Sequence, residues 1–338
     1  MPENDSRAGR GAVRPGKLRD ATADVATVSI VGLGRWGSAL ALALHAAGVR
    51  VQELVVRGAP DEAQEKLARG LGAKIAAWRA SSLFADVVWL CVADAEIAAL
   101  TAELGERWRG SDRVPRILLH SSGVLSSEVL DGARQRGVAV ASVHPFRSFP
   151  RRAEVDEANS DGGLLRGVLF GVEGEPAALK AAETLIGQVG GEAFAIAAEK
   201  KSLYHAFGSF ASPLLVSLLA AAEEVGERAG IAPEVAARML RSLAGGTFEN
   251  WSRNGTHGSF SGPVSRGDSE TIALHLTSLE GAPELDVIYR ALTAYAIAHL
   301  PVEKHGELWT VLAQKQNEQA PKKRKSIKAV SQSKRVRR

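Results

Sequence analysis

The sequence predicts an α/β fold of the Rossmann type, with a doubly wound and mainly parallel sheet, followed by an all-α domain. From Thr27 to about Glu173, short β-rich runs alternate with helical stretches, which is the pattern of a parallel sheet covered on both faces. A glycine-rich turn, GLGRWG, joins the first strand to the first helix. After about Ala197 the alternation stops, and only helical patterns follow.

Four regions follow from this pattern. We expect a disordered N-terminal extension over residues 1–25, because it offers little apolar surface to offset the entropy of ordering. Residues 26–197 are the expected Rossmann domain, and residues 198–315 are the expected helical domain for substrate binding and dimerisation. The low-complexity basic tail over residues 316–338 is expected to be disordered.

The helical half has identifiable boundaries. One long helix is expected to end at Gly230 and to kink at Pro213, because proline cannot donate a backbone hydrogen bond. The next helix begins at Pro233 and reaches about Leu243. A loop rich in Gly, Asn and Ser is expected next, followed by three helices. These segments cover residues 245–267, 269–279, 283–299 and 302–315.

Charge and targeting patterns limit the protein class. The net charge is +4, but the tail from Gln314 carries ten Lys and Arg against one Glu, so the rest of the chain is acidic overall. No secretory signal and no uncharged apolar window of about 18 residues is seen, so we expect a cytoplasmic protein that does not enter a membrane. The single cysteine, Cys91, is expected in the core. The tail either contacts nucleic-acid phosphates without sequence choice or only solubilises the chain.

The glycine-rich turn predicts a dinucleotide-binding site. Gly32 permits the tight turn, Gly34 lets the backbone approach a pyrophosphate, and Gly37 lets the helix pack on the strand. The following helix N-terminus offers free N–H groups and a partial positive charge. The other interpretation is a βα turn without a ligand. The predicted cofactor contacts in the turn are Gly32, Leu33, Gly34, Arg35, Trp36 and Gly37.

The end of the second strand distinguishes the two nicotinamide cofactors. NAD(H) would require an acidic residue about 20 positions after the glycines to bind the ribose hydroxyl. Arg57 occupies that place, and its guanidinium can pair with a 2′-phosphate, so we predict NADP(H). The alternative for Arg57 is a solvated strand end. Val92, Ala93 and Asp94 follow another strand and are expected on the nicotinamide side, although Asp94 can equally cap the next helix.

Two histidines end predicted strands. HSSG begins at His120 and HPF begins at His144, and strand ends on this edge face the cofactor crevice. A histidine is suited to passing a proton while hydride moves, so His144 is a catalytic candidate. We expect Ser121 to contact the cofactor and Ser122 to contact the substrate. The alternative for both histidines is a structural, hydrogen-bonded role.

The first helix of the second half carries a third cluster. Lys201, Tyr204 and His205 share an arc of about 100° with Gly208 and Ser212. We predict Lys201, Tyr204 and His205 as proton donors, the alternative being a solvated helix face. The opposite face is apolar and is expected to be buried. Its residues are Leu203, Phe207, Phe210, Leu214 and Leu218.

A loop near the C-terminal helices supplies the last candidates. Arg266 in GPVSRGD can clamp an anionic group of the substrate. Asp268 either contacts the substrate as well or caps the helix that begins at Ser269. No metal site is expected.

These segments together resemble a family of bacterial Rossmann-like oxidoreductases with a C-terminal domain of unknown function. The motifs are GLGRWG, ADVVWLCVAD, HSSG, HPFRSF, KSLYHAF and GPVSRGDSETIALHL, within Thr27 to Leu300. The family is similar to 6-phosphogluconate dehydrogenase and pyrroline-5-carboxylate reductase. The resemblance implies a dimerising helical domain and an active site between domains, but no substrate. The family pattern has an Asn where this chain has Pro213, so one amide is missing.

The leading hypothesis is an NADP(H)-dependent reductase or dehydrogenase that acts as a homodimer. It would move hydride between nicotinamide C4 and a carbonyl or imine carbon of a small, anionic substrate. The alternative is a non-catalytic NADP(H)-binding sensor or scaffold.

Overall fold

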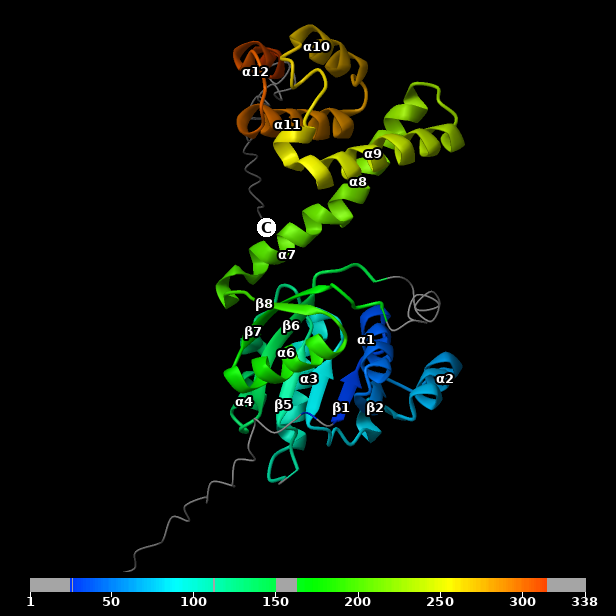
Figure 1. Ribbon diagram of the computed structural model, residues 1–338, viewed down its shortest axis with the longest axis vertical. Coiled ribbons are helices and arrows are strands. Elements are labelled where there is room, and N and C mark those ends of the chain that lie inside the picture. Colours follow the sequence, from blue (N-terminus) through cyan, green and yellow to red (C-terminus); the bar gives the residue numbers. More distant parts are fainter. Residues whose placement is uncertain (1–24, 26, 112, 150–162, 315–338) are drawn as a thin grey trace, which may run out of the picture. The chain divides into compact units, whose positions relative to one another are not determined.

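A computed structural model describes residues 25, 27–111, 113–149 and 163–314 (Figure 1). The chain divides into two compact units, residues 1–213 and 214–338. The predicted disordered segments, 1–25 and 316–338, lie almost wholly outside the described residues, so those predictions stay untested.

The first unit is built on an eight-stranded sheet in the order β3-β2-β1-β4-β5-β6-β7-β8. All neighbouring strands are parallel except the β6–β7 pair. The predicted Rossmann fold is therefore confirmed. The strands are β1 (Thr27–Val31), β2 (Arg50–Val56), β3 (Lys74–Ala77), β4 (Val87–Leu90), β5 (Ile117–His120), β6 (Ala139–Pro145), β7 (Leu169–Gly174) and β8 (Glu192–Ala195).

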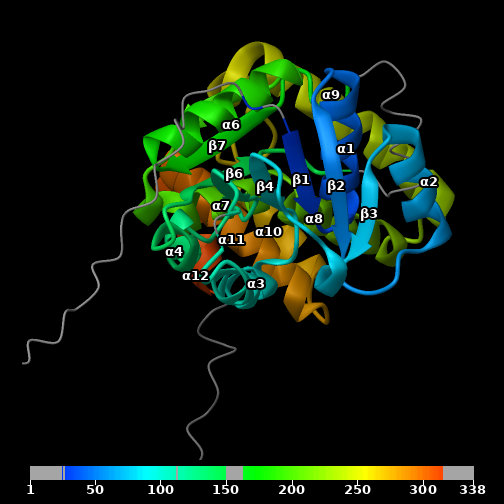
Figure 2. The ribbon, with the colours of Figure 1, turned by 90° about the horizontal axis from the view of Figure 1, so that it is seen from below.

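Helices cover both faces of this sheet (Figure 2). Helices α1 (Arg35–Ala46), α2 (Glu62–Leu71) and α6 (Pro176–Gln188) share one apolar core with the sheet. Helices α3 (Asp94–Arg107) and α4 (Asp131–Arg134) share a second core on the other face. The described residues also include three short 3₁₀ helices in the connections between elements. These are η1 (Trp78–Ala80), η2 (Ser127–Leu130) and η3 (Ala198–Lys200).

The strand order reverses beside β1, and this reversal creates a crevice at the carboxyl ends of the strands. The chain leaves β1 toward α1 on one side and leaves β4 toward α3 on the other. The backbone N–H of Cys91 donates to the carbonyl of Val31 at 2.7 Å, and the N–H of Gly32 donates to Val55 at 2.8 Å. The turns that leave β1 and β4 are thereby held at the crevice.

The predicted break at Pro213 is confirmed. Helix α7 (Lys201–Ala211) ends at Ser212, whose backbone is non-helical with φ −132° and ψ −84°, and α8 (Pro213–Arg228) begins directly after it. The division between the two units falls at the same place, so α7 belongs to the unit that contains the sheet.

The second unit contains α8, α9 (Pro233–Ser259), α10 (Ser269–Ser278), α11 (Pro283–His299) and α12 (His305–Gln314). An apolar core joins the last three helices and includes Ile272, Ile297 and Leu308. The loop predicted over 245–267 is wrong in its first part, because α9 continues to Ser259 and is interrupted only at Gly255. Each glycine in a helix costs about 1 kcal/mol. Side-chain contacts one turn apart, such as Glu249 with Arg253, support the helix beyond them.

The apolar face that runs along α7 into the start of α8 was predicted to be buried, and this prediction is wrong for the single chain. Leu203 is 71% exposed and Phe210 is 72% exposed, and the other members of the face (Phe207, Leu214, Leu218) are exposed as well. On the opposite face His205 is exposed, while Lys201 and Tyr204 are buried against the sheet. Hydrogen bonds to the sheet satisfy these polar groups, which is why the polar side can face inward.

One apolar segment meets simple criteria for a membrane span. Residues Ala198–Arg228 are long and apolar enough, by length and composition alone, and none of the tested window is buried. The expectation that the chain has no such window is therefore wrong by this measure, since residues 202–222 contain no Asp, Glu, Lys or Arg, although Ser, His and Tyr interrupt the apolar run. A break at Ser212 divides this segment into α7 and α8.

Candidate active site

The three motif glycines each meet a different steric demand. Gly32 has φ +97°, and a Cβ there would lie 2.6 Å from the carbonyl oxygen of Cys91. At Gly37 a Cβ would lie 1.9 Å from the carbonyl oxygen of Gly32, so the close packing of α1 on β1 requires glycine. Nothing lies within 4 Å of the corresponding position at Gly34. The backbone at Gly34 is therefore open to a ligand.

The N-terminus of α1 keeps its positive end unneutralised. Gly34 is its N-cap, no side chain caps it, and its first turn contains no acidic residue. The neighbouring helices differ, because α2 and α3 both have two acidic residues in the first turn. The exposed N–H groups of α1 can therefore hold an anion.

A cavity of about 850 Å³ lies over this turn and runs along the crevice. Six of the predicted cofactor residues line it, namely Gly32, Leu33, Gly34, Arg57, Val92 and Ala93. Arg35 is exposed at the start of α1. Asp94 is the first residue of α3, whose N-cap is Ala93, and it makes no side-chain cap.

Ser121 is tied into an aromatic cluster behind the turn. Its hydroxyl accepts from the indole N–H groups of Trp36 and Trp89, each at 2.8 Å. The ring of Phe149 lies against Trp36 with centroids 4.9 Å apart. Burial raises the pKa of the Cys91 thiol beside Ser121 well above its usual range, which fits the core role predicted for Cys91. Through Phe149, the segment after β6 contacts the glycine turn.

His120 is held in a structural arrangement. The backbone N–H of Ser122 donates to its Nδ1 at 3.1 Å, so the hydrogen is on Nε2, which donates to the carbonyl of Ser126 at 3.2 Å. Burial lowers the pKa of His120 to about 3, and the charge of Lys201 acts in the same direction. Both ring nitrogens are occupied, so this neutral histidine shapes the HSSG turn.

A half-buried His144 and a buried Tyr204 form a pair. The Tyr204 hydroxyl lies 2.8 Å from Nδ1 of His144, and the rings meet edge to face with centroids 5.4 Å apart. Burial lowers the pKa of His144 to about 4, with further lowering from the charges of Lys201 and His205. Burial raises the pKa of Tyr204 to about 12. Both side chains are therefore neutral near pH 7.

Lys201 is 1% exposed and directed into the protein. Its Nζ donates to the carbonyl of Ser122 at 3.0 Å and to the hydroxyl of Ser142 at 2.6 Å. Burial lowers the pKa of Lys201 to about 8, against the nearby carboxylates of Glu173 and Asp94, which raise it. Lys201 therefore joins the HSSG turn to β6 and α7.

Glycines make room for this cluster. A Cβ on Gly123 would lie 2.6 Å from Cδ2 of His205 and 2.9 Å from Nε2 of His144. A Cβ on Gly171, in β7, would lie 2.9 Å from the Tyr204 hydroxyl. The two imidazoles and the phenol can reach these positions because both backbones lack side chains.

A second cavity, of about 400 Å³, opens beside this cluster. No acidic residue is found among the described residues that line it, while His144, His205 and Arg147 all contribute. Nη1 of Arg147 donates to the carbonyl of Leu164 at 2.7 Å, which orients the guanidinium. The sequence predicted the two histidines but not Arg147, although HPFRSF was one of its motifs. The other lining residues are Pro145, Phe146, Ser148, Gly208, Ser209, Ala211, Ser212 and Pro213.

Comparison with protein families covers both halves of the chain. Residues 11–145 match a Rossmann-like domain, and residues 168–296 match a domain of unknown function (DUF2520). The chain combines a Rossmann-like domain with a DUF2520 domain. The resemblance predicted from the sequence is thereby confirmed. No protein among the curated sequences matches the chain.

Solved structures share the fold at low sequence identity. A proposed NADP oxidoreductase from Bacteroides fragilis is 18% identical, with a TM-score of 0.62, over 80% of this chain and 97% of that one. A protein from Thermotoga maritima is 23% identical, with a TM-score of 0.61, over 87% and 100%. An imine reductase from Myxococcus stipitatus in complex with NADP⁺ is 16% identical, with a TM-score of 0.54, over 85% and 98%. At these identities the likeness establishes the fold.

The DUF2520 domain also includes the predicted substrate residues Arg266 and Asp268, which belong to the second unit. Asp268 is the N-cap of α10, and its carboxylate accepts from the backbone N–H of Thr271 at 3.0 Å and from its hydroxyl at 2.7 Å. Capping was one of the two roles predicted for Asp268. Arg266 is exposed.

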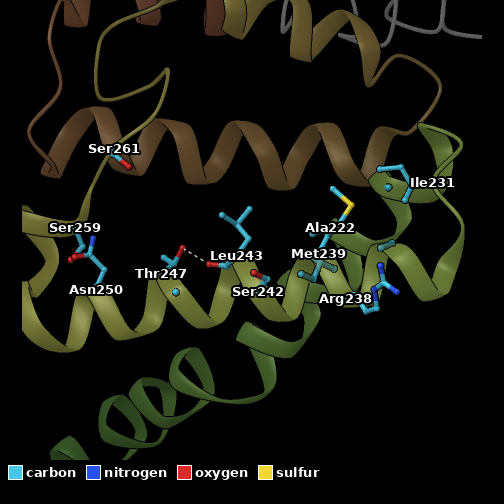
Figure 3. Close-up of a pocket in the computed structure, with 14 residues that line it drawn as sticks. Ala222, Ile231, Arg238, Met239, Ser242, Leu243, Thr247, Asn250, Ser259 and Ser261 are labelled. Atoms are coloured by element: carbon cyan, nitrogen blue, oxygen red, sulfur yellow. Dashed lines mark hydrogen bonds between the residues drawn. The ribbon is translucent and has the colours of Figure 1, made fainter.

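A shallow groove of about 790 Å³ marks the second unit, and α9 provides most of its lining. Met239, Leu243 and Thr247 follow one another along this helix (Figure 3). Met239 is 54% exposed and Leu243 is 72% exposed. The groove is thus an open, partly apolar surface.

Proposed function

We propose that this chain is an NADP(H)-dependent oxidoreductase that transfers hydride to or from a small, anionic substrate. One observation carries the proposal. The His144–Tyr204 pair borders a cavity with no carboxylate among its described lining residues, at the same sheet edge as the open glycine turn. A proton-transfer group and a dinucleotide site at one edge are what a hydride-transfer enzyme needs.

The residues present fit a nicotinamide dinucleotide. Gly34 leaves open space, the end of α1 is positive, and the cavity continues to Arg57. We assign the pyrophosphate to the turn and the 2′-phosphate of NADP(H) to Arg57. The nicotinamide supplies or accepts the hydride when it is bound.

We assign the proton to His144. In this assignment the Tyr204 hydroxyl donates to Nδ1, 2.8 Å away, and the neutral ring carries its hydrogen on Nε2, beside Gly123 and His205. From Nε2 the proton passes to the carbonyl oxygen or imine nitrogen of the substrate, and the phenol hydrogen moves to Nδ1. The phenolate left on Tyr204 takes up a proton from water, which restores the pair for the next turnover. Lys201 is a positioning residue, because its ammonium holds Ser122 and Ser142.

We assign the anionic group of the substrate to the second cavity. Arg147 and His205 provide its cationic and donor groups, and the carbonyl of Leu164 orients the guanidinium of Arg147. Arg266, predicted for this task, belongs to the second unit and stays a prediction.

We also propose a homodimer. Helix α8 has no buried residue over its 16 positions, and α9 has one over 27, although both carry large apolar side chains. Monomeric proteins rarely expose apolar surface this continuous. A second copy is the favoured cover because Arg238 and Asn250 line the same groove as Met239, and a lipid interior would not accept these polar groups. The cytoplasmic location stays a prediction.

The proposed proton transfer from Tyr204 through His144, called the relay below, is tested by comparing variants of two tyrosines. Tyr289 makes a similar contact to His275, at 2.7 Å and edge to face, in the second unit. With NADPH and a panel of oxo acids and cyclic imino acids, Tyr204→Phe should lower kcat about 100-fold or more, the usual range for a general acid. Tyr289→Phe should not change it. The Kd for NADPH should stay within about twofold in both variants.

Two results would contradict the proposal. Full turnover in Tyr204→Phe would remove the relay, and folded protein that binds neither NADPH nor NADH in calorimetry would remove the cofactor. A non-catalytic sensor is the second candidate. It is favoured by Pro213, which lines the second cavity where the family pattern has an amide. A sensor would bind NADPH and oxidise it with no member of the panel.

A further inference from the structure

Two arginines, Arg57 and Arg79, line the first cavity at the end where the proposed function places the adenosine of the cofactor. Val56 of β2 pairs with Ala77 of β3, so the residues that follow these strands emerge at the same edge. Arg57 comes directly after β2, and Arg79 lies on η1 directly after β3. Both line the cavity of about 850 Å³ that also contacts Gly32 and Gly34.

A carboxylate from a third element lies at the same place. Glu96, in the first turn of α3, forms an ion pair with Arg57 and lines the same cavity. Their side chains are 35% and 81% exposed, so the pair is solvated and its partners can be exchanged. Arg57 and Glu96 together carry no net charge. Arg57 alone is therefore a weak site for a phosphate dianion.

Arg79 sits on a rigid turn. Nη2 of Arg107 donates to the carbonyls of Trp78 at 3.0 Å and Ser81 at 3.2 Å. The fully buried carboxylate of Glu53 accepts from the next backbone N–H groups, including that of Leu83 at 2.9 Å. The guanidinium of Arg79 itself makes no ion pair with any described residue.

The other described acidic residue that lines this cavity is Glu103, and its carboxylate already accepts a hydrogen bond. The carboxylate of Glu103 lines the cavity and accepts from the indole N–H of Trp78 at 2.5 Å. Glu96 is thus the carboxylate that competes for the arginines. Arg79 provides a cation on a preorganised backbone.

We propose that Arg79 is a second binding residue for the 2′-phosphate of NADP(H), and that Glu96 limits the preference for this cofactor by competing for Arg57. This inference rests on the proposed function. A phosphate dianion takes donors from both guanidinium groups, and it must displace Glu96 from Arg57. NAD(H) leaves the Arg57–Glu96 pair intact. The chain therefore binds both dinucleotides, with a modest preference for NADP(H).

Calorimetry on the full chain tests this with NADPH, NADH and 2′,5′-ADP. Arg79→Ala should weaken binding of NADPH and 2′,5′-ADP about tenfold, the usual effect of losing one charge-assisted hydrogen bond, and change NADH by less than about twofold. Glu96→Gln should tighten NADPH severalfold and leave NADH unchanged. The exposed pair Arg69 and Glu65 on α2 does not line the cavity, so Arg69→Ala and Glu65→Gln are the controls.

The outcomes separate this inference from the function on which it rests. If the folded wild-type chain binds neither dinucleotide, the proposed function fails. If it binds both but Arg79→Ala weakens them equally or not at all, only the role of Arg79 fails. If Glu96→Gln weakens NADH without tightening NADPH, Glu96 holds a ribose hydroxyl and is not a competitor. Circular dichroism of each variant checks that it is folded.

Discussion

The two units differ in how much of their apolar surface a single chain can bury. In the first unit, β4 and β5 are buried at every residue, and two cores lie on opposite faces of the sheet. In the second unit, α10, α11 and α12 share a core, but α8 and most of α9 touch none. The first unit therefore has the contacts of an independent domain, while no described residue covers most of the apolar surface of α8 and α9 in the second.

Glycine substitutions give the largest expected contrast between the units. Gly37→Ala places a Cβ 1.9 Å from a backbone oxygen and should cost more than about 3 kcal/mol of unfolding free energy. Gly245 lies in α9 with nothing within 4 Å, so Gly245→Ala should stabilise by about 1 kcal/mol. Urea unfolding measures both. A destabilised Gly245→Ala dimer would mean that a second copy packs against that position.

Acidic substitutions in the groove on α9 test whether a second copy of the chain packs there. Met239→Glu with Leu243→Glu should convert a dimer into a monomer, because each buries a charge in an apolar interface. Phe84→Glu is the control, since this exposed aromatic lies in the first unit. Sedimentation velocity at about 50 μM reports the mass. A wild-type chain that is already monomeric would contradict the homodimer, and recovery of the chain with lipid vesicles would favour a membrane instead.

Acid should weaken the first unit through its buried histidines. Burial lowers the pKa of His120 to about 3 and that of His144 to about 4, from a usual value of 6.5. Between pH 6.5 and 4, the unfolded chain binds these protons and the folded chain does not, so stability falls as the pH falls. We expect a loss on the order of 5 kcal/mol over this window, because each of the two histidines contributes about 1.4 kcal/mol per pH unit. Unfolding at a series of pH values measures it, and His120→Asn should reduce the slope.

The sequence predicts local features better than it predicts which surface is covered. The glycine turn, the break at Pro213 and the helices from Ser269 onward depend on nearby residues, and the structure has them all. The apolar face of α7 was recognised, but its burial depends on what lies opposite. Leu203 and Phe210 are exposed because no described residue of the chain covers them.

Features assembled from distant elements were beyond sequence reasoning. Glu96 meets Arg57 only because α3 follows β4, which lies on the other side of β1 from β2. Arg79 joins them through the pairing of β2 with β3. Neither contact leaves a spacing signal. Arg147 did have a signal, because it lies three residues after His144 at a strand end.

Substitutions of the helix caps give the smallest expected difference between the units, and they test whether Asp268 only caps α10. Asp61 caps α2 in the first unit, where its carboxylate accepts from the N–H of Gln64 at 2.8 Å, and Asp268 caps α10 in the second. Replacing either with alanine should cost about 1 kcal/mol, which chemical denaturation can measure. If capping is the whole role of Asp268, both variants keep the wild-type kcat/KM. A selective loss of kcat/KM in Asp268→Ala would show that its carboxylate contacts the substrate, because the lost cap is common to both variants.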